Sequence, residues 1–128
     1  MTVEIDPAVP NQYLRLDSTS GFFVVSLKDI TPYLDGFRVT LEVGNLTSAR
    51  YVGFKLNATW GPRFDYSKYS AEAYQKWESQ KQTNSFPYTD PIVTATWNKV
   101  DLILPSTSSS QLGFINVSID TNIVSLGR

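Results

Sequence analysis

The stretch FRVTLEV, residues 37–43, alternates apolar and polar side chains without exception. In an extended chain the apolar side chains then share one face and the polar ones the other, which is typical of a half-buried β-strand. The stretch YVGFKLNATW, residues 51–60, repeats this alternation, with the following side chains on the inward face: Val52, Phe54, Leu56, Ala58 and Trp60. We therefore expect two strands, joined through the turn-rich GNLTSAR, residues 44–50, either as a hairpin or as a crossover between two sheets.

Shorter stretches on both sides of this pair predict further strands. GFFVVSLKDI, residues 21–30, is apolar on both faces around its centre, as expected for a central strand, and PYLDG supplies the turn after it. Downstream, WNKVDLIL (97–104) and GFINVSID (113–120) alternate again, and NIVSL (122–126) gives a last short run. About six or seven short strands separated by turn residues favour a mostly all-β fold, an antiparallel β-sandwich of immunoglobulin-like character.

The size of the chain fits one domain. It has 128 residues, of which 41% are hydrophobic, and this is enough apolar material for one core. We place a single β-sandwich domain at residues 21–128, preceded by a lead-in segment at residues 1–20. The lead-in starts with MTVEIDPAVP, which lacks the basic and apolar regions of a signal peptide, so we expect a boundary placed just before a domain.

One passage breaks the β pattern and predicts a short α-helical insertion at about residues 68–82. SAEAYQKWESQKQ, residues 70–82, contains no glycine or proline and is rich in helix formers. Ser70 stands where an N-cap residue is expected, and Glu72 follows in the first turn. TNSFPYTDP, residues 83–91, carries two prolines and is expected to connect the insertion to the next strand.

Aromatic rings crowd this insertion and allow two interpretations. Six rings lie between residues 60 and 77: Trp60, Phe64, Tyr66, Tyr69, Tyr74 and Trp77. In the first interpretation the helix plugs an open end of the sandwich, which we favour for Trp60, Ala73 and Trp77. In the second the rings form a platform for a partner, and for the tyrosines the two interpretations weigh about equally. The candidate partner-binding residues are Tyr66, Tyr69, Tyr74 and Trp77.

Charge and composition exclude several function classes. The 11 basic and 12 acidic residues are scattered without runs, so no surface is committed to a nucleic acid. No apolar stretch approaches the roughly 20 residues of a membrane span. Because the sequence has no histidine and no cysteine, it offers no imidazole or thiolate for catalysis or for a zinc site, and we expect no metal and no cofactor.

Carboxylates are the remaining catalytic candidates. Asp65 and Asp90 flank the insertion, and two carboxyl groups about 5 to 9 Å apart in a cleft are what glycoside hydrolysis requires. Both residues are better explained as turn or cap residues, because aspartate is common at such positions. We therefore expect no enzyme activity.

Four stretches of the chain carry a family resemblance: FFVVSLKDITPYLDGFRVTLEVGNLTSARYVGFKLNATWG (22–61), YSAEAYQKWE (69–78), TWNKVDLIL (96–104) and LGFINVSIDTNIVSL (112–126). Together they resemble the globular domain of unknown function in YajI-type bacterial lipoproteins. The resemblance implies that a lipoprotein signal and a coiled-coil stem precede the domain in the parent protein, which would place it in the periplasm or anchor it to the outer membrane. Neither a lipobox cysteine nor heptads occur in this sequence, and the family implies no catalytic residues.

These observations predict a non-catalytic, envelope-associated binding or structural module, whose partner is either another envelope protein or a glycan. The alternative is a glycan-binding or glycan-processing domain that uses the aromatic insertion together with Asp65 or Asp90. The plug interpretation has a measurable consequence, since Trp77→Ala would then cost about 3 to 5 kcal/mol of stability.

Overall fold

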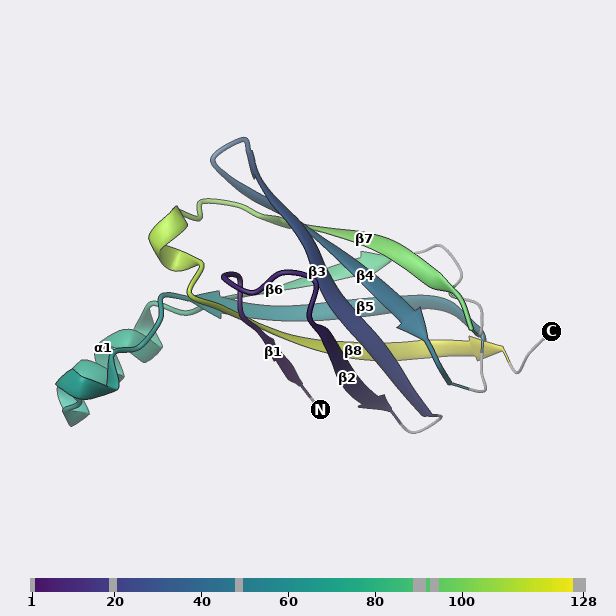
Figure 1. The fold of residues 1–128 in the computed structure, drawn as a ribbon, viewed down its shortest axis with the longest axis horizontal. Coiled ribbons are helices and arrows are strands. Elements are labelled where there is room, and N and C mark those ends of the chain that lie inside the picture. The colour runs from purple at the N-terminus through teal and green to yellow at the C-terminus, as the bar shows by residue number, and fades with distance from the viewer. Residues whose placement is uncertain (1, 19–20, 48–49, 89–91, 93–94, 126–128) are drawn as a thin grey trace.

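The computed structural model describes residues 2–18, 21–47, 50–88, 92 and 95–125. They form two four-stranded antiparallel sheets packed as a sandwich (Figure 1). The first sheet has the strand order β1 (Val3–Ile5), β8 (Phe114–Ser125), β5 (Arg50–Gly61) and β6 (Gln82–Tyr88). The second has the order β2 (Tyr13–Ser18), β3 (Gly21–Tyr33), β4 (Gly36–Asn45) and β7 (Trp97–Leu104). The predicted sandwich is confirmed, and its immunoglobulin-like character stays a prediction.

The core lies between the two sheets and is built largely from the side chains that the alternation placed inward. Val39, Leu41 and Val43 of β4 are fully buried, as are Leu56 and Ala58 of β5. The same holds for the inward positions of the later strands: Val100, Leu102, Leu104, Ile115 and Val117. Each of the valine, leucine and isoleucine side chains stabilises the fold by roughly 1.5 to 3 kcal/mol relative to an exposed one.

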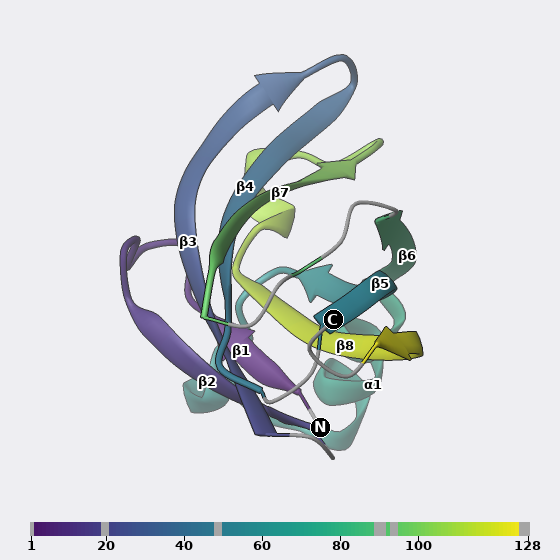
Figure 2. The ribbon, with the colours of Figure 1, turned by 90° about the vertical axis from the view of Figure 1, so that its right-hand side faces the viewer.

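β4 and β5, the strands with the clearest alternation in the sequence, belong to different sheets. β4 pairs with β3 and β7, whereas β5 pairs with β6 and β8. The link between them is therefore the crossover and not the hairpin, and Figure 2 shows the two layers that it joins. The last apolar run is not a separate strand in its described part, residues 122–125, because β8 continues without a break to Ser125, and Leu126 lies outside the described residues.

Residues 1–20 contribute to both sheets. β1 pairs with β8 at one edge of the first sheet, and β2 pairs with β3 at one edge of the second. Ile5 and Leu16, one from each strand, are 2% exposed and belong to the core. The segment expected as a lead-in therefore supplies an edge strand to each layer.

The helical insertion is shorter than expected and has two parts. A 3-10 helix, η1, covers Tyr66–Lys68, and the α-helix α1 covers Ala71–Ser79, so the range 68–82 was too long at both ends. At the start, Tyr69 is extended, and the predicted N-cap Ser70 accepts a hydrogen bond from the Ala73 backbone N–H at 3.0 Å. At the other end, Gln82 already belongs to β6 and pairs with Trp60 of β5.

The segment expected as a connection after the helix is mostly this strand, β6. Its register sets Phe86 opposite Leu56 and Pro87 opposite Lys55, and β6 forms the edge of its sheet. Phe86 and Tyr88 pack against the core, and the Tyr88 ring lies 5.0 Å from that of Phe54. A proline is tolerated in an edge strand, which explains why it does not interrupt the ladder.

Candidate functional site

The connection between β5 and β6 carries the sequence-predicted site residues and lies beyond one end of the sandwich. In Figure 1, α1 projects away from the strand ends instead of lying across a sheet. None of its nine residues, all of which are described, is buried. The helix is therefore not a lid over the core.

Phe64 is the centre of the rings in this connection. Its ring centroid lies 4.8 Å from that of Tyr66, 5.5 Å from Tyr74 and 5.2 Å from Trp77. Tyr69 is slightly farther away, at 6.2 Å. Most of these contacts are edge-to-face, an arrangement that the ring quadrupoles favour. We call Phe64, Tyr66, Tyr69, Tyr74 and Trp77 the aromatic cluster.

Trp77 joins the aromatic cluster to the sandwich. Its indole N–H donates to the Pro62 carbonyl at 2.6 Å, and its ring lies 5.7 Å from that of Phe114, the first residue of β8. The Lys81 ammonium lies 4.2 Å from the centre of the Trp77 ring and 5.6 Å from that of Phe114. A cation over a ring face is attracted by about 0.5 to 1 kcal/mol at an exposed site, so Lys81 holds the two rings together.

The predicted rings divide between core and surface. Trp60 is 2% exposed and its indole N–H donates to the Thr107 hydroxyl at 3.1 Å, so it belongs to the core, as the plug interpretation expected. Ala73 and Trp77 are half-buried. The three tyrosines are the most exposed: Tyr66 at 72%, Tyr69 at 63% and Tyr74 at 37%.

An acidic residue of the helix orders part of the cluster. Hydrogen bonds from Lys81 and then from Tyr74 lower the pKa of the Glu78 carboxyl below its usual value, and Lys81 lies 3.0 Å away. The hydrogen bond to Glu78 in turn raises the pKa of the Tyr74 phenol. Tyr74 therefore donates its hydroxyl to Glu78 of the same helix, while Tyr66 and Tyr69 are largely exposed to solvent.

Of the two carboxylates considered from the sequence, Asp65 and Asp90, the structure describes only Asp65. The Asp65 carboxylate caps η1 by accepting hydrogen bonds from the Ser67 backbone N–H at 3.0 Å and from its hydroxyl at 2.6 Å. These bonds from Ser67 lower the pKa of Asp65, which keeps the carboxyl ionised and unsuited to act as a general acid. Asp90 lies outside the described residues. Asp65 is thus the cap residue that its sequence context indicated.

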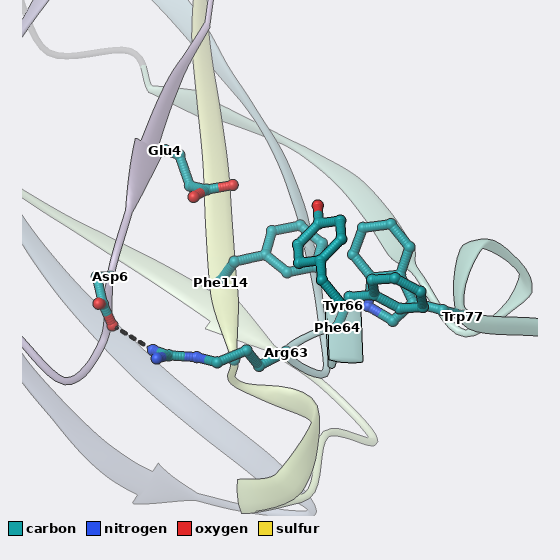
Figure 3. Close-up of a pocket in the computed structure, with 8 residues that line it drawn as sticks. Glu4, Asp6, Arg63, Phe64, Tyr66, Trp77 and Phe114 are labelled. Atoms are coloured by element: carbon teal, nitrogen blue, oxygen red, sulfur yellow. Dashed lines mark hydrogen bonds and ion pairs between the residues drawn. The ribbon is translucent and has the colours of Figure 1, made fainter. Parts of the chain in front are cut away.

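A groove of about 350 Å³ runs beside the aromatic cluster. Figure 3 shows Glu4 and Asp6, from β1 and the residue after it, on one side and the rings of Tyr66, Trp77 and Phe114 on the other. Arg63 closes one end, where its guanidinium donates to the Asp6 carboxylate at 2.8 Å. The groove therefore offers ring surface, two carboxylates and one guanidinium, which suits binding.

Close backbone packing shapes the floor of the groove. The Gly113 N–H donates to the Gly61 carbonyl at 2.8 Å. A Cβ atom at Gly113 would lie 2.0 Å from the Arg63 backbone nitrogen. Glycine is required here because the two connections approach too closely for any side chain.

Of the eight residues that line the groove, only Tyr66 and Trp77 are among the candidate partner-binding residues of the sequence. Glu4 and Asp6 were assigned to the lead-in, although the alternation in VEI hints at a strand. Arg63 and Phe64 sit in an irregular stretch, where periodicity carries no information about neighbours. Only the pairing of β1 with β8 brings the chain start next to the insertion.

The described part of the chain holds no group of three or more acidic side chains placed to bind a metal ion. It also contains no helix with the length and apolar character needed to cross a membrane.

A second aromatic pair lies on the outer face of the other sheet. The rings of Tyr13 and Trp97 are 5.8 Å apart and 58% and 51% exposed. Ser26 and Gly44 lie opposite them in the ladders, and a Cβ on Gly44 would come within 2.8 Å of the Trp97 ring. The small residues between them let the two rings meet across the sheet.

Two solved structures with this fold are bacterial lipoproteins. The trimeric lipoprotein SadB of Salmonella enterica matches with a TM-score of 0.83 and 22% identity, over 98% of this chain and 64% of the SadB chain. The uncharacterized lipoprotein YajI of Escherichia coli matches with a TM-score of 0.73 and 22% identity, over 94% of this chain and 68% of that one. The chain thus spans less than two thirds of the length of SadB.

A family model also matches nearly the whole chain, while a search of curated proteins gives no match. Residues 6–123 fit the model of DUF3251, which is described as a protein of unknown function. This match confirms the resemblance found in the sequence. The chain belongs to the DUF3251 family, and it has the same fold as the lipoproteins YajI and SadB.

Proposed function

We propose that this domain is a non-catalytic binding module of the bacterial envelope and that the aromatic cluster is its binding surface. The observation that carries the proposal is the exposure of Tyr66 and Tyr69 on a segment that the core does not need. Large exposed rings of this kind are enriched at the centres of protein and ligand interfaces.

The cluster is ordered before any partner arrives. Phe64 contacts four other rings, and Trp77 ties them to the end of β5 through the Pro62 carbonyl. Side chains already held in place lose little conformational entropy on binding, which favours affinity. Tyrosine adds a hydroxyl to its apolar ring, so each exposed position serves both apolar and polar contacts.

A non-catalytic role is supported by what the site contains. The sequence has no histidine or cysteine, and the ionised Asp65 carboxylate is engaged by Ser67. The Asp6 carboxylate of the groove is paired with Arg63. These groups can bind and orient a ligand, and none of them is poised as a nucleophile or a proton donor.

The envelope assignment rests on the relatives. SadB, which is trimeric, and YajI are lipoproteins of two bacteria. By analogy, the parent of this domain is anchored at a membrane surface by a lipid, which leaves the domain itself free to bind an envelope protein or a glycan.

The test is retention of the purified domain on cell envelopes of its host. We expect the double variant Tyr66→Ala/Tyr69→Ala to melt as the wild type does and to lose retention. Tyr13→Ala removes a tyrosine of comparable exposure from the other sheet and serves as the matched control. Retention of the double variant at the wild-type level would contradict the proposal.

A further inference from the structure

We propose that the groove beside the aromatic cluster binds a short, neutral saccharide. This inference rests on the proposed function, because it names the ligand class for the same end of the molecule. It uses six lining residues: Glu4, Asp6, Arg63, Tyr66, Trp77 and Phe114.

The size and lining of the groove fit a small ligand. Its volume of about 350 Å³ lies at the lower end of the range of roughly 300 to 1,000 Å³ that is usual for small-molecule sites. Phe114 is 7% exposed and forms the base, Trp77 is half-buried, and Tyr66 stands at the rim with 72% of its surface exposed. A sugar ring presents C–H groups on its faces, which pack against aromatic rings.

The polar side of the groove matches the edge of a sugar. Among the described residues, no partner is found for the Glu4 carboxylate. One oxygen of Asp6 accepts from Arg63 at 2.8 Å and from the Ala8 N–H at 2.9 Å. Carboxylates accept and a guanidinium donates, so together they can satisfy hydroxyl groups in both of their roles.

The balance of charges selects a neutral ligand. Glu4 and Asp6 are negative, while Arg63 is positive and the Lys81 ammonium lies over the rings of Trp77 and Phe114. A cationic ligand would meet Arg63 and Lys81, and an anionic one would meet Glu4 and Asp6. A polar ligand without net charge avoids both repulsions and still uses every hydrogen-bonding group.

An apolar peptide segment fits the same groove less well. An apolar side chain could pack on the rings, but it would cover the Glu4 carboxylate without giving it a hydrogen bond, which is costly. A hydroxyl-rich ligand supplies that bond while it packs on the rings. The arrangement therefore favours a saccharide over an apolar protein segment.

The experiment follows the indole N–H resonances of the isotope-labelled domain by NMR, because its three tryptophans report three places. Trp77 lines the groove, Trp60 is in the core, and Trp97 lies on the outer face of the other sheet. The probes are the neutral trisaccharides cellotriose, maltotriose and N,N′,N″-triacetylchitotriose. We expect at least one of them to shift the Trp77 resonance saturably and to leave that of Trp97 unchanged.

Charged sugars test whether the groove selects a neutral ligand, and variants test which lining residues contact it. Glucosamine and glucuronic acid should bind more weakly than neutral sugars of the same size. Glu4→Gln should weaken the binding of the best trisaccharide about threefold to tenfold, because the amide keeps one acceptor but loses the negative charge that strengthens the hydrogen bond. Tyr66→Ala should weaken it about threefold to tenfold through lost ring contact. The matched controls, Glu72→Gln on the exposed helix and Tyr13→Ala, should bind as the wild type does.

Three outcomes would overturn the inference: no trisaccharide shifts Trp77, a shift occurs that Glu4→Gln and Tyr66→Ala leave intact, or a charged sugar binds more tightly than the neutral ones. If saccharides fail while envelope retention still depends on Tyr66 and Tyr69, the saccharide is wrong and the binding function stands. If retention does not depend on these tyrosines, the proposed function itself fails.

Discussion

Trp60 and Trp77 are seventeen residues apart in the sequence but belong to two different regions: Trp60 lies in the core between the sheets, and Trp77 lies in the aromatic cluster. Trp60 sits between the sheets, 2% exposed, with its indole N–H bonded to Thr107. Trp77 is half-buried in a cluster built mainly from its own connection, with its indole N–H bonded to Pro62. The comparison teaches that an aromatic side chain is placed by the periodicity around it: alternation sends Trp60 into the core, whereas rings in an irregular connection pack against each other.

The largest effect is expected at the core end of this comparison. Trp60→Ala removes the largest fully buried side chain and leaves a cavity between the sheets, which costs about 3 to 5 kcal/mol. The melting temperature should fall by about 10 to 20 °C. Thermal and urea unfolding measure this. If Trp60→Ala and Trp77→Ala lowered the free energy of unfolding by the same amount, the distinction between the core and the aromatic cluster would be wrong.

The second effect concerns the contact that joins the two regions. Gly113→Ala places a Cβ atom against the Arg63 backbone and should cost about 1 to 3 kcal/mol, because the backbone has to move. Gly61→Ala is the matched control, since its Cβ would meet side-chain atoms of Phe114 at 3.3 Å, and it should cost less. Equal melting temperatures for the two variants would show that the connections are not held closely together.

A smaller effect is expected at Trp77, below the 3 to 5 kcal/mol that a plug would imply. Trp77→Ala loses a half-buried ring and the hydrogen bond to Pro62, which amounts to about 1 to 2 kcal/mol. The loss should be local, so hydrogen exchange in α1 should quicken while that of the core strands changes little. Uniform acceleration in all strands would mean that the cluster and the core unfold as one unit.

The smallest effect is a pH dependence confined to α1. The pKa of Glu78 is lower in the folded protein than its ordinary value of 4.5, so folding favours the carboxylate. Its contribution is present above pH 4.5 and is lost as the pH falls through the lowered pKa. The difference in helix stability between wild type and Glu78→Gln, followed by NMR, should therefore shrink on acidification. A difference that stays constant or grows toward low pH would contradict this assignment.

Sequence reasoning works for the sheets because alternation reports directly which face is buried. It placed Leu56 and Trp60 correctly without knowing their neighbours in space. It also located the N-cap Ser70, because a cap depends on residues within one turn.

The groove was not predictable in this way. Glu4 and Arg63 are brought together by the pairing of β1 with β8, and no local pattern encodes that pairing. The strand β6 was missed for a different reason: its proline weakens the strand pattern, although Phe86 and Tyr88 keep the spacing of two that marks the inward face.

Pro87 affects whether two copies of this domain can pair through the edge strand β6. It stays in register opposite Lys55 in an antiparallel ladder, and a nitrogen without a hydrogen is best tolerated where it faces the open side of the edge. A second molecule that tried to extend the sheet along β6 would find no donor at that point. Pro87 therefore disfavours growth of the sheet through this edge when copies of the domain lie close together.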